Sequence, residues 1–150
     1  MSSPSVSLAI VAPPLKFSYG EIMTTAPGVT IVGRADGHSR PLDLVEGEGT
    51  AEALVWPGMG ARHRSMHRFE LGAGARTLPQ RHDGEAVYYV VDGAASILDL
   101  STGDRAALGA GCMVHVDPDT TYRFEATLPA VLVGGPCPPD PATYDGWSAA

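Results

Sequence analysis

The chain has 150 residues and a formal net charge of −7, from 10 Lys and Arg against 17 Asp and Glu. This length fits one ordinary domain with a single core, and the acidic balance argues against nucleic acid as a partner. Hydrophobic residues make up 44% of the chain, but no apolar run reaches the roughly 18 residues of a membrane span. We therefore expect no membrane partner. The apolar stretch 6–15 ends in proline and lacks a preceding positive charge, so it does not predict a signal peptide, and we expect a cytoplasmic location.

Short strands are the expected elements, because 13 prolines and 18 glycines interrupt the chain too often for long helices. The segments between them are rich in β-branched and aromatic residues. In chain order we expect strands at 29–34, 51–56, 64–71, 86–91, 95–100, 113–116, 121–126 and 130–135. Turns at 56–60 and 101–104 are predicted to close hairpins, the second one onto residues 105–108. Many short strands with frequent turns predict an all-β sandwich or barrel.

Proline-rich segments flank these strands at both ends of the chain, at 12–17 and 136–147. We interpret them as extended arms that cover the barrel. The expected organisation is an N-terminal arm (1–27), a β-barrel (28–135) and a C-terminal arm (136–150). No internal repeat, charge block or linker suggests a further domain.

Two glycine-bounded spacings carry a resemblance to a known family. The first runs through Gly74, Gln80, His82, Ala86 and Gly93, and the second through Gly111, Asp117, Asp119, Tyr122 and Ala126. They resemble the two motifs of the cupin superfamily, in which a His-x-His and a Glu, and then a Pro-x-Gly and a His, stand at these intervals. The resemblance covers roughly residues 50–135. It implies a small single-domain jelly-roll barrel with a central ligand pocket, often dimeric, so we expect a homodimer.

The four matched positions that hold metal in typical cupins carry Gln80, His82, Ala86 and Tyr122. Ala86 offers no donor atom, and ionising the phenol of Tyr122 is costly near neutral pH. One imidazole with neutral donors binds divalent metals weakly. We therefore expect either no cofactor or one weakly bound Zn, Fe, Ni or Mn. No phosphate-binding loop or dinucleotide glycine pattern is present, so no nucleotide cofactor is expected.

A replacement set of metal ligands is an open alternative. His63, His67 and Phe69 alternate along one face of the strand predicted at 64–71, and the apolar Phe69 suggests that this face points inward. His67, and with it His63, could then approach His82 and rebuild a site from His82, Gln80 and His67. The other hypothesis is that His67 is a hydrogen-bonded wall and that His63 is exposed.

Counting by twos along the matched strands also turns Tyr88 and Phe124 inward. The predicted pocket is lined by His67, Phe69, Gln80, His82, Tyr88, Tyr122 and Phe124. We expect His82, Tyr122 and Tyr88 to be catalytic, and His67, Phe69, Gln80 and Phe124 to contact the substrate. Arg81, Asp83 and Glu85 should face outward, although Glu85 could swing in as a substitute carboxylate.

This pocket predicts an enzyme that acts on a small apolar or aromatic organic molecule. An imidazole can act as a general base, and a tyrosine hydroxyl can donate a hydrogen bond to a carbonyl or enolate oxygen. Cyclisation, isomerisation or elimination would suit these groups. The arginine-biased, Ala-, Gly- and Pro-rich composition is typical of a bacterial source, and the chain is similar to bacterial natural-product cupins such as polyketide cyclases. Two alternatives remain: a metal-dependent dioxygenase with the altered ligand set, and a non-catalytic binding or sensor cupin.

Overall fold

The computed structural model describes residues 23–26, 28–33 and 39–144, which belong to two compact units divided after Arg40. In the first unit, β1 (Met23–Ala26) and β2 (Val29–Ile31) form a two-stranded antiparallel sheet. The strand expected at 29–34 is therefore observed as β2, paired with β1. The expected N-terminal arm, 1–27, lies mostly outside the described residues.

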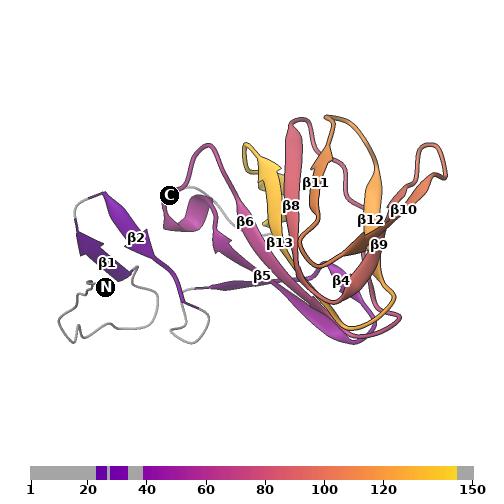
Figure 1. Ribbon diagram of the computed structural model, residues 1–150. Coiled ribbons are helices and arrows are strands. Elements are labelled where there is room, and N and C mark those ends of the chain that lie inside the picture. Colours follow the sequence, from indigo (N-terminus) through magenta and orange to yellow (C-terminus); the bar gives the residue numbers. More distant parts are fainter. Residues whose placement is uncertain (1–22, 27, 34–38, 145–150) are drawn as a thin grey trace. The chain divides into compact units, whose positions relative to one another are not determined.

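The second unit contains two antiparallel sheets that face each other, as Figure 1 shows. In the five-stranded sheet the strand order is β10 (Arg105–Gly109), β9 (Ala94–Asp99), β12 (Tyr122–Ala126), β7 (Arg76–Thr77) and β4 (Val45–Glu46). In the six-stranded sheet the order is β11 (Met113–Val116), β8 (Glu85–Asp92), β13 (Ala130–Cys137), β6 (Met66–Leu71), β5 (Gly49–Val55) and β3 (Arg40–Leu42). This arrangement confirms the all-β jelly-roll prediction.

Side-chain alternation explains why these segments form strands between two faces. Along β8 the side chains from Glu85 to Val90 are alternately exposed and buried, which matches the two-residue period of a strand. The inward side chains of both sheets meet in one core that includes Phe69, Leu132 and Phe124, each 0% exposed. Fully burying a side chain of this size contributes about 1.5–3 kcal/mol.

Both predicted hairpins are present. Residues 101–104 join β9 to β10, and Asp99 shapes the turn by accepting hydrogen bonds from the backbone N–H groups of Ser101 (2.8 Å) and Thr102 (3.2 Å). The turn after β5 contains a 3-10 helix, η2 (Pro57–Met59), and β5 pairs with β6 beyond it. The chain order of the core strands is thus as predicted.

Asp119 adopts the backbone conformation expected of the glycine in the second cupin motif. Asp119 stands where the second cupin motif has glycine, and its φ is 64°. This left-handed conformation suits glycine, but aspartate is among the few other residues that tolerate it. The turn therefore keeps its shape without its glycine.

The chain after β13 lies against the barrel. A second 3-10 helix, η3 (Pro141–Thr143), is followed by Tyr144, which is 1% exposed and packs on Trp56 with ring centroids 5.1 Å apart. Of the expected C-terminal arm, residues 136 and 137 continue β13, and residues 141–143 form η3. Within the described ranges, no helix is long and apolar enough to cross a membrane.

Candidate active site

Backbone hydrogen bonds bring the two motifs side by side. Gln80 N donates to Tyr122 O (2.8 Å), and Tyr122 N donates to Gln80 O (2.9 Å). His82 follows two residues later, and its ring lies 6.1 Å from the Tyr122 ring, measured between centroids. Gln80, His82 and Tyr122 therefore form one cluster, as their spacing in the sequence predicted.

The two ring nitrogens of His82 have different surroundings. Nδ1 is hydrogen-bonded to Asp140 Oδ2 at 2.7 Å, whereas Nε2 is buried and has no hydrogen-bond partner. The whole residue is 7% exposed. Asp140 precedes η3 and was not among the predicted site residues. An imidazole with one nitrogen held and the other free is suited to accept a proton or to bind a polar ligand atom.

The side-chain amide of Gln80 is a second unused polar group. The residue is 6% exposed, and neither Oε1 nor Nε2 has a hydrogen-bond partner. Leaving such a group unpaired costs about 1–3 kcal/mol, and buried polar atoms without a protein partner need an explanation such as a ligand or a water molecule. Gln80 can offer a ligand one donor and one acceptor.

Two tyrosine hydroxyls form a pair beside this cluster. Tyr88 Oη and Tyr122 Oη are 2.5 Å apart, and each residue is 1% exposed. Burial raises the pKa of both phenols above the ordinary value of 10, so both remain protonated at neutral pH. When Tyr88 donates to Tyr122, the proton of Tyr122 is left free to donate to a ligand.

His67 lies in a separate contact with the C-terminal segment. Its Nε2 is 2.7 Å from Tyr144 Oη, and burial, together with the charge of His82, lowers the pKa of His67 from 6.5 to about 4. Burial raises the pKa of Tyr144 to about 12. His67 is therefore neutral at neutral pH and joins the C-terminal segment to β6.

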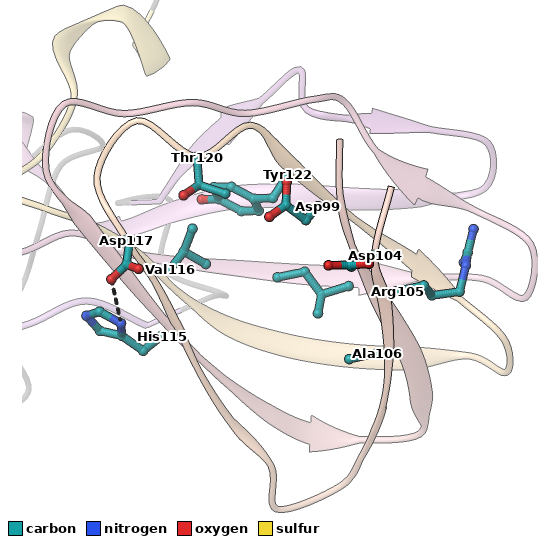
Figure 2. A pocket seen from close by; sticks show the side chains of 10 residues that line it. Asp99, Asp104, Arg105, Ala106, His115, Val116, Asp117, Thr120 and Tyr122 are labelled. Carbon is teal, nitrogen blue, oxygen red and sulfur yellow. Dashed lines mark ion pairs between the residues drawn. The ribbon is translucent and has the colours of Figure 1, made fainter. Parts of the chain in front are cut away.

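A cavity of about 270 Å³ reaches the cluster at Tyr122 (Figure 2). It is lined by Ile97, Asp99, Asp104, Arg105, Ala106, His115, Val116, Asp117, Thr120 and Tyr122. The lining comes largely from β10 and β11, the edge strands of the two sheets, and from the segments next to them. Arg105 extends away from Tyr122 and pairs with Glu125 at 2.7 Å, so three aspartates dominate the charge of the cavity wall.

The seven residues predicted to line the pocket are all buried, which confirms their inward orientation. Their contacts differ from the prediction in one respect. Phe69 and Phe124 were expected to contact substrate but pack on Tyr88, with ring centroids 6.3 and 4.8 Å away. Of the seven, Tyr122 lines the cavity in Figure 2. The two phenylalanine rings contact Tyr88 in the core, so they hold Tyr88 in position.

The suggested approach of His63 to His82 is wrong, because His63 precedes β6 and is exposed. Glu85 does not swing in, because it is exposed and pairs with His115 at 3.0 Å. Arg81 also faces outward, as predicted, and pairs with Asp119 at 3.2 Å.

The residues at the cupin metal positions do not fit a divalent metal. Ala86 supplies no donor atom, and the hydroxyl of Tyr122 remains protonated. His67, the proposed replacement ligand, bonds Tyr144 through Nε2, so only its Nδ1, which is buried without a hydrogen-bond partner, could bind a metal. Among the residues that the structure describes, no three His, Cys, Asp or Glu side chains gather in a group that could hold a metal ion.

The facing sheets and the site at the junction of the two motifs define a jelly-roll protein of the cupin class. Residues 67–133 match the family model of the cupin domain, so this part of the chain is a cupin domain. No curated protein sequence matches the chain closely enough to count as a relative.

Solved structures share this fold. A putative ethanolamine utilization protein Q from Salmonella typhimurium is similar with a TM-score of 0.64 and 14% identity, over 80% of this chain and 94% of that one. The polyketide cyclase RemF from Streptomyces resistomycificus has a TM-score of 0.56 and 24% identity, over 72% and 80%. A predicted oxalate decarboxylase from Thermotoga maritima has a TM-score of 0.55 and 21% identity, over 71% and 96%. These identities establish the fold alone.

Proposed function

We propose that this cupin is an acid–base enzyme that enolises a small neutral carbonyl compound in the course of a cyclisation, isomerisation or elimination. The observation that carries this proposal is the buried Nε2 of His82, which has no hydrogen-bond partner, in a ring whose centroid lies 6.1 Å from that of the protonated Tyr122. A base next to a hydrogen-bond donor is the arrangement that proton abstraction beside a carbonyl requires.

Each group has a distinct task in this chemistry. His82 Nε2 takes a proton from the carbon next to the carbonyl, and Tyr122 donates a hydrogen bond to the oxygen on which charge develops. The hydroxyls of Tyr88 and Tyr122 share a hydrogen bond, and with Tyr88 as its donor this bond strengthens the one that Tyr122 donates to the substrate. The proton then returns from His82 to carbon, or to the leaving group in an elimination. A positioned base contributes about 10²–10⁴-fold, and an oxyanion donor about 10²–10³-fold.

The cavity wall favours a neutral substrate. Asp99, Asp104 and Asp117 face the cavity, while the charge of Arg105 is paired with Glu125. Carboxylates repel an anion such as oxalate, so the likeness to a polyketide cyclase agrees better with this wall than the likeness to an oxalate decarboxylase. The volume of about 270 Å³ suits a small molecule.

The enzyme is proposed to work without a resident metal, because its donor set does not fit one. The dioxygenase alternative lacks the motif carboxylate, because Ala86 stands at that position, and it would have to use Nδ1 of His67, since Nε2 is bonded to Tyr144. A chelator should therefore leave turnover unchanged, and the purified protein should contain far less than one equivalent of Zn, Fe, Ni or Mn.

Exchange of carbon-bound hydrogen tests the proposal before the natural substrate is known. The probe is 2-tetralone, a neutral bicyclic aromatic ketone, and proton NMR in D₂O follows loss of the signals next to its carbonyl. Wild-type protein should accelerate exchange over buffer. His82→Ala and Tyr122→Phe should each remove most of the acceleration, by roughly 10²-fold or more.

A matched control is Tyr89→Phe, which removes the hydroxyl of an exposed tyrosine on the outer face of β8. Absence of acceleration by the wild type, or equal rates in the wild type, His82→Ala and Tyr122→Phe, would contradict enolisation. A protein that binds the ketone without accelerating exchange would favour the binding or sensor alternative.

We also propose that the outer face of β8 and β11 joins two copies of the chain. Val87, Tyr89, Val91 and Met113 are 37–66% exposed there, and Met113 lies opposite Tyr89 in the register. Gathered apolar side chains of this kind mark interaction surfaces. Light scattering should give the mass of a dimer for the wild type and of a monomer for Met113→Lys.

A further inference from the structure

Asp140 reaches the site from outside both cupin motifs. It lies 58 residues after His82 in the chain, between β13 and η3, yet its Oδ2 is 2.7 Å from His82 Nδ1. We infer that Asp140 is a positioning residue that fixes His82 in the tautomer with the proton on Nδ1 and the lone pair on Nε2. This inference rests on the proposed role of His82 as a base.

The carboxylate of Asp140 is held on both sides. Its Oδ1 accepts a hydrogen bond from Ala142 N at 3.0 Å, so Asp140 is also the N-cap of η3. Its backbone oxygen accepts a bond from Thr143 N, also at 3.0 Å. With one oxygen committed to the cap, the other is directed at His82 without loss of further rotamer freedom.

Tyr144 anchors this segment to the barrel. Its ring packs on Trp56, and its hydroxyl is bonded to His67 Nε2 at 2.7 Å. The two ends of η3 thus contact the two buried histidines, Asp140 at His82 and Tyr144 at His67. The segment has a defined place because a buried aromatic ring and two hydrogen bonds hold it there.

The chemistry of the contact selects one tautomer. An ionised carboxylate only accepts hydrogen bonds, so the shared proton belongs to Nδ1, and a neutral ring then has no proton on Nε2. The buried Nε2 is thereby prepared to accept a proton. Histidine in water favours the opposite tautomer, with the proton on Nε2, so without Asp140 most molecules would present a proton where the base is needed.

The test is Asp140→Ser, with Asp83→Ser as its control. Serine can cap η3 in place of aspartate, but its side chain is too short to reach His82. Asp83 adjoins His82 in the chain and is exposed, and its replacement makes the same chemical change. Protein labelled with ¹⁵N at histidine reports the tautomer directly, through the nitrogen shifts and couplings of His82, assigned by comparison with His82→Gln.

The expected result is an Nδ1–H tautomer for His82 in the wild type and in Asp83→Ser, and predominantly Nε2–H in Asp140→Ser. In the exchange assay Asp140→Ser should lose roughly 10²–10⁴-fold in rate, with a smaller change in KM. An Nε2–H tautomer in the wild type, or an unchanged tautomer in Asp140→Ser, would overturn the inference. The tautomer of His82 is measured without substrate. It therefore tests the role of Asp140 even if the exchange assay contradicts the proposed enolisation.

Discussion

Replacing His67 with glutamine should remove much of the sensitivity of this fold to mild acid. His67 is 0% exposed, and burial, followed by the charge of His82, lowers its pKa from 6.5 to about 4. The unfolded chain therefore takes up a proton on His67 near pH 6.5, whereas the folded chain resists it until about pH 4. Stability that is present above pH 6.5 is lost as the pH falls through this window.

The size of the effect follows from the two pKa values. The pKa of His67 is 6.5 in the unfolded chain and about 4 in the folded chain. This difference lowers the free energy of unfolding by about 2 kcal/mol between pH 7 and pH 5. Glutamine does not titrate, and its amide can keep a hydrogen bond to Tyr144 Oη. His67→Gln should therefore lose about 2 kcal/mol less than the wild type over the same range.

Urea unfolding at pH 7 and pH 5, followed by tryptophan fluorescence, measures both differences. The quantity of interest is the double difference between proteins and pH values, because every other titrating group is common to the two chains. Equal losses of unfolding free energy in the wild type and His67→Gln would refute the assignment of a buried, neutral histidine.

Three further outcomes are expected from the contacts described above. Tyr144→Phe should lower the free energy of unfolding in the urea titration by about 1–3 kcal/mol, because it leaves His67 Nε2 buried without a partner. Tyr144→Phe should also weaken protection of the C-terminal segment in hydrogen exchange. Gly134→Ala should destabilise by more than Gly103→Ala, since its Cβ would lie 2.1 Å from the backbone oxygen of Val87, whereas a Cβ at Gly103 meets nothing within 4 Å; equal midpoints would contradict this packing.

Strand positions and the motif spacing could be predicted because both are local properties. The two-residue period of β8 and its bounding glycines are visible in the sequence from Gly84 to Gly93, and inward orientation follows from register. The strands that escaped prediction, such as β4 and β7, have two residues each and show no period. These short strands form because a neighbouring strand pairs with them, and local sequence does not show which strand will be the neighbour.

Side-chain partners were harder to predict than side-chain orientation. Alternation placed Phe69 and Phe124 inside correctly, but it could not say whether an inward ring meets a cavity or another ring. Phe124 meets Tyr88 across the two sheets, whereas Phe69 meets it within the six-stranded sheet, over the intervening β13. His63 shows the same limit. The alternation of the sequence predicts that it faces inward, but it precedes β6 and is exposed.

The contact between Asp140 and His82 could not be predicted from the sequence. The aspartate followed by Pro141 is a typical start of a helical turn, so the cap could have been predicted, and the segment was expected to cover the barrel. The sequence does not show that Asp140 reaches His82, because the position of Asp140 depends on the packing of Tyr144 against Trp56. The chain has alanine at the motif position that carries the metal-binding carboxylate in typical cupins, and it places a carboxylate on the opposite nitrogen of His82. A carboxylate on Nδ1 orients the ring and leaves the lone pair of His82 on Nε2, as the proposed base requires.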